Sequence, residues 1–187
     1  MANFNFLLEK SEYNSFAQAC VNAESIWKDS PSSCVSSTRS ALEGAIKWMY
    51  RKDSSLHFTR STKTDGVNVT DLFDRMESES FKNAVPQQIW GRINQIRRLA
   101  NKVLHENYPV TSEDAMRCLH NLFDFVNWLD SRYGMNHVER IFSRGSVPTN
   151  PSTFKTILKY VGTAVGGAAA LMLAAAFADG NKGDRHT

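Results

Sequence analysis

The sequence predicts an all-α fold in which a helical bundle is followed by one carboxyl-terminal transmembrane helix. Apolar residues recur at the three- and four-residue spacing of amphipathic helices, and alternating strand patterns are scarce. The chain has 187 residues, of which 42% are hydrophobic and 11% aromatic, and this is enough to build one buried core. Near the carboxyl end, 19 consecutive uncharged residues from Tyr160 to Ala178 are long enough to cross a bilayer.

Three helices and one loop are predicted in the first 76 residues. Apolar spacing predicts a helix over about 11–27, and Ser30-Pro31 is a strong start signal for a second helix that runs over about 31–51. The stretch 53–68 is polar, contains a glycine and has no periodicity, so we expect a long loop there. A short helix should follow over about 70–76.

Two longer helices complete the predicted bundle. Pro86 opens a helix that should end before Tyr108, because that residue precedes a proline. Thr111 and the acidic residues after it form a good cap for the last helix, which should run to Tyr133 and stop at Gly134. Its apolar residues cover more than one stripe, so this helix lies at the centre of one subunit or contacts a second copy.

The helix opened by Pro86 carries three chemically capable side chains on one face. At about 100° per residue, Arg98 and His105 lie almost above one another, with Asn101 between them. The polar stripe should face outward, because the apolar residues lie on nearly the opposite side: Ile89, Ile93, Ile96, Ala100 and Val103. A guanidinium can hold phosphate oxygens while an imidazole transfers a proton to or from a ribose hydroxyl, and neither step needs a metal ion. The spacing therefore suits phosphodiester cleavage in RNA, with Asn101 orienting either neighbour.

A structural explanation of these residues stays open. Arg98 can be a solvated surface residue, and His105 can be a cation that interacts favourably with the helix dipole. Arg97 and Lys102 belong to a local basic cluster on the same helix. Such a cluster suits nucleic acid, but surface helices often carry one.

The second predicted helix carries a charged pair with two interpretations. Arg39 and Glu43 are one helical turn apart, so they can form a surface ion pair worth a few tenths of a kcal/mol. Alternatively, Glu43 orients Arg98 or His105 across the helices.

Neither a metal site nor a disulfide framework is predicted. The three cysteines lie in helical apolar patterns without metal-ligand spacing, so we expect buried free thiols at Cys20, Cys34 and Cys118. A glycine-rich phosphate loop and a carboxylate cluster suited to metal chemistry are also missing from the sequence. We expect no metal and no cofactor.

Three segments occur in the order of a known family. The chain opens with Asn-Phe-x-Phe-Leu at 3–7, a helix over 36–43 precedes Trp-Met-Tyr at 48–50, and 96–106 contains Arg-Leu-Ala-Asn-x-x-x-His. From Phe4 to about Gly134 the chain resembles the helical domain of unknown function at the N-terminus of many type I restriction endonuclease R subunits, a branch of the HEPN superfamily.

The resemblance implies an HEPN-like helical bundle over 1–140 and a homodimer, with Arg98 and His105 in an active site at the dimer interface. It implies a metal-independent endoribonuclease or a nucleic-acid-binding component of a prokaryotic defence system. Its partners would be RNA or a nucleotide, and a protein of that system. The alternative is a non-catalytic protein-interaction or nucleotide-binding module tethered to the membrane.

The carboxyl-terminal segments complete the predicted domain organisation. A linker over 141–155 should lead to the transmembrane helix over 156–178 and a polar tail over 179–187. Flanking charges and the absence of an export signal favour a single pass through the bacterial inner membrane, with the amino-terminal domain in the cytoplasm. The alternatives are a flexible Ala/Gly tail and a small-residue pore.

Overall fold

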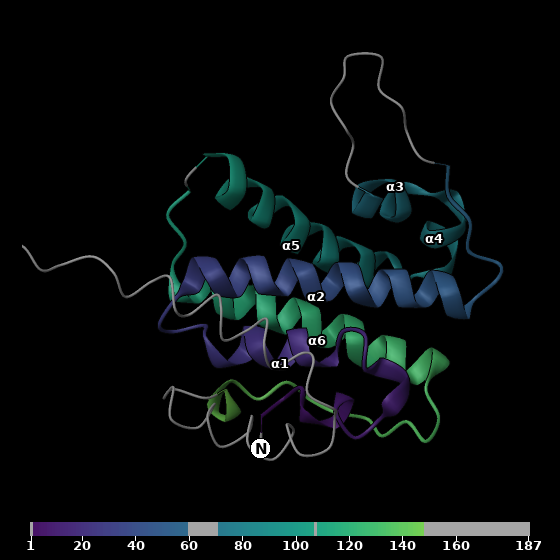
Figure 1. Ribbon diagram of the computed structural model, residues 1–187, viewed down its shortest axis with the longest axis horizontal. Coiled ribbons are helices and arrows are strands. Elements are labelled where there is room, and N and C mark those ends of the chain that lie inside the picture. Colours follow the sequence, from purple (N-terminus) through teal and green to yellow (C-terminus); the bar gives the residue numbers. More distant parts are fainter. Residues whose placement is uncertain (1, 60–70, 107, 148–187) are drawn as a thin grey trace, which may run out of the picture. The chain divides into compact units, whose positions relative to one another are not determined.

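Helices dominate the part of the chain that the computed structural model describes, residues 2–59, 71–106 and 108–147 (Figure 1). These residues belong to one compact unit, Met1–Thr149. The described α-helices are α1 Ala17–Ser25, α2 Pro31–Lys52, α3 Asp71–Glu77, α4 Glu79–Ala84, α5 Gln87–Glu106 and α6 Ser112–Tyr133. Three short 3-10 helices are η1 Asn5–Leu7, η2 Ser11–Tyr13 and η3 Arg144–Ser146. The three described ranges contain no strand, as the sequence predicts.

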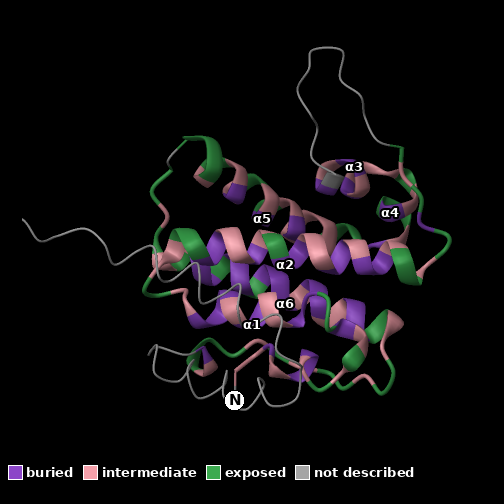
Figure 2. Ribbon diagram, in the orientation of Figure 1, coloured by how far each residue is buried: buried purple, intermediate pink, exposed green. Residues whose placement is uncertain are grey.

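The core lies around α2, which packs against α1, α5 and α6. Figure 2 shows buried residues on the sides where these helices face each other. Apolar residues along α2 are fully buried at three- and four-residue spacing: Val35, Leu42, Ala45, Ile46 and Met49. Full burial of one valine, leucine, isoleucine or methionine side chain stabilises the fold by about 1.5–3 kcal/mol. At Gly44 an added Cβ would lie 3.0 Å from Cβ of Phe16, so the glycine lets the start of α1 approach α2 closely.

The first α-helix begins later than the apolar spacing predicts. The residues before it form η2 and a turn, and α1 starts only at Ala17. Tyr13 and Phe16 are three residues apart, the repeat of a 3-10 helix, and their side chains are 0% and 1% exposed. The Tyr13 hydroxyl donates a hydrogen bond to Asp130 at 2.7 Å. The 3-10 geometry at η2 therefore occurs together with a long-range hydrogen bond from Tyr13 to Asp130.

The region between α2 and α5 contains one helix more than predicted. Ser78 begins α4, because its hydroxyl oxygen accepts a hydrogen bond from the Phe81 backbone N–H at 3.2 Å. The Phe81 ring is fully buried and stacks on Tyr50, with 6.1 Å between ring centroids. The short helix expected over 70–76 is present as α3. The expected loop is seen up to residue 59, and the rest of it lies outside the described residues.

The last two helices confirm their predicted bounds. Thr111 caps α6: its hydroxyl oxygen accepts from the Asp114 N–H, and the Asp114 carboxylate accepts from the Thr111 N–H, each at 3.1 Å. The residue that follows α6, Gly134, is a glycine for a reason of space, since its φ of −79° is open to any residue. A Cβ at Gly134 would lie 2.3 Å from Oδ1 of Asp130 and 2.4 Å from the Tyr13 hydroxyl oxygen.

The opening motif at 3–7 attaches the amino-terminal segment to the bundle and to the segment around Ser143. The Asn3 backbone N–H and side-chain amide donate to Oε1 of Glu24 at 2.9 and 2.7 Å, and Asn3 also exchanges two hydrogen bonds with the Ser143 backbone. Glu24 is only 1% exposed, and this burial raises the pKa of its carboxyl group. Phe4 packs edge-on against Phe123 of α6, with ring centroids 5.9 Å apart. The motif therefore has a structural role.

The predicted fold class requires one correction, which concerns the transmembrane helix. Among the described residues, no helix combines the length and the apolar character needed to span a bilayer. Length is available, because α2 and α6 have 22 residues each, but both carry charged residues on their outer faces. The segment 156–178, for which the helix was predicted, lies outside the described residues. The described residues are therefore all-α, and none of their helices could span a membrane.

Candidate nucleic-acid interface

The polar face of α5 points away from the core, as its sequence predicts. Ile93, Ile96 and Ala100 are fully buried. On the other side of the helix Arg98 and His105 are exposed, whereas the neighbouring Asn101 is half-buried. Arg98 and His105 make no hydrogen bond or ion pair with any other described residue. Both side chains are therefore available to a ligand.

A cavity of about 320 Å³ lies between α5 and α6. Arg98 and Lys102 line it from α5, Arg117 and Asn121 line it from α6, and Tyr108 lines it from the connection between the two helices. Of the three residues predicted to act in catalysis, Arg98 reaches this cavity, whereas Asn101 and His105 are not among its lining residues. The guanidinium of Arg98 therefore lies in the wall of the cavity. The imidazole of His105 lies outside it, in the exposed last turn of α5.

Positive charge exceeds negative charge in the α5–α6 cavity. Lys102 lies over the Tyr108 ring, with Nζ 5.3 Å from the centroid. Arg117 pairs with Asp114 at 2.5 Å, and Asp114 also accepts a hydrogen bond from Thr111. That hydrogen bond, together with Arg117, lowers the pKa of Asp114. Three cations and one carboxylate therefore line the cavity, which favours an anionic ligand.

A second cavity, of about 310 Å³, lies between α5 and α6 nearer to the start of α5. Its cation, Arg92, forms an ion pair with Asp124 of α6. His120 lies 3.6 Å from the same carboxylate. Because the charge of Arg92 is matched within the protein, this cavity has less attraction for a phosphate than the one around Arg98.

The other predicted supporting residues lie away from the cavity lining. The Arg97 guanidinium stacks over the Phe73 ring at 4.7 Å, and its Nε donates to Asn94 at 3.0 Å. Burial lowers the pKa of Arg97, and the charges of Arg98 and Arg39 act in the same direction. Arg39 is half-buried, and its Nε has no hydrogen-bond partner in the described residues. These contacts place Arg97 next to α3 and α2.

Glu43 pairs with Lys47, one turn further along α2, at 2.7 Å. Its side chain forms no hydrogen bond or ion pair with the side chain of Arg39, Arg98 or His105 within the described residues. The described residues show a surface ion pair of Glu43 with Lys47, and not the predicted pair with Arg39.

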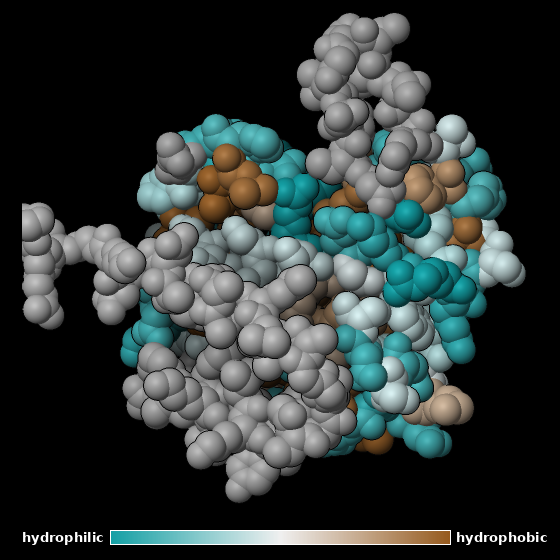
Figure 3. Space-filling view, viewed as in Figure 1, coloured by the Kyte–Doolittle hydropathy of each residue, from teal (hydrophilic) through white to brown (hydrophobic). Residues whose placement is uncertain are grey.

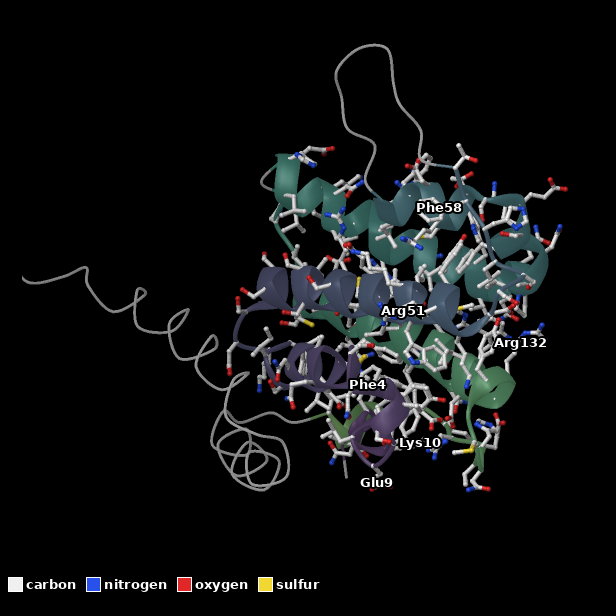
Figure 4. The ribbon with its side chains drawn as sticks, turned by 45° about the vertical axis from the view of Figure 1, so that its right-hand side comes forward. Phe4, Glu9, Lys10, Arg51, Phe58 and Arg132 are labelled. Atoms are coloured by element: carbon white, nitrogen blue, oxygen red, sulfur yellow. The ribbon has the colours of Figure 1, made fainter. Side chains whose placement is uncertain are left out.

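A second charged cluster, which sequence reasoning missed, surrounds Asp130 of α6. This carboxylate is fully buried and accepts hydrogen bonds from Lys10 at 2.5 Å, Tyr13 at 2.7 Å, His137 at 2.9 Å and Arg140 at 3.2 Å. Burial acts to raise the pKa of Asp130, but the hydrogen bonds outweigh it and lower that pKa. Figure 4 shows Lys10 beside the carboxyl-terminal end of α6. The sequence feature that could have indicated this cluster is an acidic residue, Asp130, on the apolar side of α6.

The cysteines confirm the prediction of buried free thiols. Cys20, Cys34 and Cys118 are all buried, and none forms a disulfide. Burial raises the pKa of Cys34 and of Cys118 to about 12.

The cavity residues Tyr108, Arg117 and Asn121 were also missed by the sequence analysis. Their signal was weak but present: Arg117 and Asn121 are four residues apart on α6, and the short connection after α5 makes the two helices antiparallel neighbours. Only the packing of the helices shows that these residues face Arg98.

Comparison with known proteins agrees with the extent of the bundle. Residues 21–144 match a protein family described as a domain of unknown function, DUF4145. No curated protein and no solved structure matched the chain. The family match runs from within α1 through α6 and covers more than half of the sequence, so the chain belongs to the DUF4145 family.

Proposed function

We propose that this protein binds RNA along the polar face of α5 and cleaves it without a metal ion. The observation that carries the proposal is the exposed pair Arg98 and His105, neither of which is engaged by another described residue. Arg98 also lines a cavity with an excess of positive charge. The resemblance to HEPN ribonucleases supports the same two residues.

The helix geometry fixes how a substrate would lie. Seven residues of α-helix rise about 10.5 Å, so the RNA backbone must run along α5 to reach both Arg98 and His105. Arg98 would bind the phosphate oxygens and offset the charge that grows on them. His105 would take the proton of the ribose 2′-hydroxyl as its oxygen attacks phosphorus, and would return a proton to the departing 5′-oxygen. Asn101 is a positioning residue beside them.

The test is cleavage of fluorescent single-stranded RNA by the full chain in excess chelator. The expected result is a product with a 2′,3′-cyclic phosphate, and loss of about 100-fold or more in rate for His105→Gln. His120→Gln is the matched control, because this histidine is also exposed but lies on α6. Equal rates for His105→Gln and the parent protein would reject His105 as the proton-transfer group.

A non-catalytic module is the second candidate, and one observation favours it. His105 does not line the cavity that contains Arg98, so binding there can occur without proton transfer. In this case the parent protein binds RNA or a nucleotide, Arg98→Ala weakens binding, and no cleavage product forms. The same assay therefore distinguishes the two functions.

A homodimer is part of the proposal, because the HEPN resemblance implies a site shared by two copies. Apolar side chains gather at the carboxyl-terminal end of α5 (Figure 3), where Leu104 is 55% exposed next to His105. Light scattering on the parent protein and on Leu104→Glu tests this. A dimer that dissociates in the variant supports the proposal, and a monomeric parent protein contradicts it.

A further inference from the structure

We infer that the α5–α6 cavity is a subsite for one unstacked nucleotide of single-stranded RNA, with its base on Tyr108 and its phosphate among Arg98, Lys102 and Arg117. This inference rests on the proposed function and deepens it, because it assigns the class of substrate and the residues that recognise a base. The volume of about 320 Å³ is at the small end of ligand pockets, which suits one nucleotide.

The phosphate half of the subsite comes from charge on both helices. Arg98 and Lys102 are four residues apart on α5, and Arg117 faces them from α6. Asp114 neutralises Arg117 in part, because the two lie 2.5 Å apart. The guanidinium of Arg98 keeps all its donors free of the described residues, so it is the strongest phosphate ligand of the three.

The base half of the subsite comes from an aromatic ring at the edge of the same cavity. Tyr108 is 39% exposed, and the Lys102 ammonium lies over its ring at 5.3 Å. An exposed aromatic face beside cations is the arrangement with which proteins bind unstacked bases of single strands. In double-stranded RNA the bases are stacked inside the helix and cannot reach such a ring.

Two side-chain amides, those of Gln95 and Asn121, add hydrogen-bonding groups to the lining of the cavity. Asn121 is 6% exposed, and its Nδ2 donates to Oε1 of Gln95 at 3.1 Å. This bond fixes which end of the Gln95 amide is held by the protein. The Gln95 amino group then has no acceptor among the described residues and is available to a base edge. Gln95 is thus a candidate determinant of base preference.

Binding of non-cleavable oligonucleotides to the full chain tests the subsite. The probes are a 2′-O-methyl oligouridylate of eight nucleotides and an abasic oligonucleotide of the same length, measured by fluorescence anisotropy. The parent protein should bind the oligouridylate about tenfold or more tightly than the abasic probe, because stacking on an aromatic ring strengthens binding. Tyr108→Ala should remove this difference, and Tyr108→Phe should keep it.

One control and one further variant make the result specific. Ile141→Ala removes a residue that is 89% exposed and lies outside the cavity, and it should leave both affinities unchanged. Gln95→Ala should change the ratio of affinities for oligoadenylate and oligouridylate by about fivefold, the effect of one hydrogen bond. Circular dichroism should show the same helix content in every variant.

The outcomes separate this inference from the proposed function. Equal affinity of Tyr108→Ala and the parent protein for oligouridylate overturns the base subsite. If Arg98→Ala still weakens binding of both probes in that case, backbone binding on α5 stands alone. Failure of the parent protein to bind either probe overturns both proposals.

Discussion

Two clusters of charged residues, one around Asp130 and one in the α5–α6 cavity, differ in how their charges are matched. Around Asp130 the carboxylate is buried and receives hydrogen bonds from Lys10, Tyr13, His137 and Arg140. In the α5–α6 cavity three cations face one carboxylate. Matched, buried charges hold segments of the chain together, whereas exposed and unmatched charges remain available to a ligand.

The comparison also explains why residue types alone did not locate the site. Both clusters contain arginine, lysine and aspartate, and both draw on α6. The Asp130 cluster joins the amino-terminal segment to the segment after Gly134. The charged groups around Asp130 therefore bind one another in the folded chain and are not available to a ligand. Burial and partners, which depend on tertiary structure, decide which of the two clusters is available to an anionic ligand.

The largest effect is expected at Asp130. Asp130→Ala leaves Lys10 and Arg140 without their buried partner, and we expect the free energy of unfolding to fall by about 3–5 kcal/mol. Urea denaturation measures it. Asp124→Ala is the control, because it breaks the more exposed pair with Arg92 and should cost less than about 1 kcal/mol. Similar losses in the two variants would contradict the distinction between matched and available charges.

The pH dependence of stability should separate two of the buried carboxylates, Asp130 and Glu24. Hydrogen bonds lower the pKa of Asp130, so its contribution is present above the unfolded value of about 3.9 and is lost as the pH falls through the folded pKa. Burial raises the pKa of Glu24, so its contribution is fullest below about 4.3 and is lost as the pH rises through the folded pKa.

Urea midpoints measured between pH 3 and pH 7 check these opposite signs. Asp130→Asn should flatten the loss of stability on the acid side. Glu24→Gln should make the change from acid to neutral pH more favourable than in the parent protein. The sign assignment fails if Glu24→Gln steepens the loss of stability as the pH rises.

Arg98 should show the reverse of the behaviour of Asp130. Arg98→Ala removes an exposed side chain without described partners, so stability should change by less than about 0.5 kcal/mol. RNA binding should weaken, and the slope of log affinity against log salt should fall in magnitude by about one. Titrations between 50 and 200 mM salt measure the slope. Arg144→Ala removes an equal charge outside the cavity and should leave the slope unchanged.

Sequence reasoning predicted the long helices well because their apolar spacing is a local property. The bounds of α5 and α6 and the cap at Thr111 follow from residues within a few positions of each other. The late start of α1 could not be predicted, because Tyr13 meets a residue 117 positions away. The predicted transmembrane helix rested on the length and composition of one segment, which lies outside the described residues.

The candidate site was predictable on one helix and not on two. Helical periodicity was sufficient to place Arg98 and His105 on the outer face of α5. It gave no information about Tyr108, Arg117 or Asn121, because their position beside Arg98 depends on how α6 packs against α5.

Substitution of Asp114 should have the smallest effect and gives the most specific test. Its carboxylate takes part in a hydrogen-bonded contact within the fold and also belongs to the charges of the α5–α6 cavity. It caps α6 with Thr111 and also carries the negative charge in the α5–α6 cavity. Asp114→Asn keeps a side-chain acceptor for the cap, so stability should fall by less than about 1 kcal/mol. Loss of the carboxylate frees Arg117, so RNA affinity should rise severalfold at low salt.

Glu113→Gln is the matched control for that variant. It removes the neighbouring carboxylate, which pairs with Arg144 and does not line the cavity, so RNA affinity should rise less. Anisotropy titrations at 50 mM salt compare the two variants. An equal rise in both would show that net charge attracts RNA and that the cavity has no special part in binding. A rise confined to Asp114→Asn would place the phosphate next to Arg117, because Asp114 is the carboxylate that pairs with Arg117 and lines the cavity.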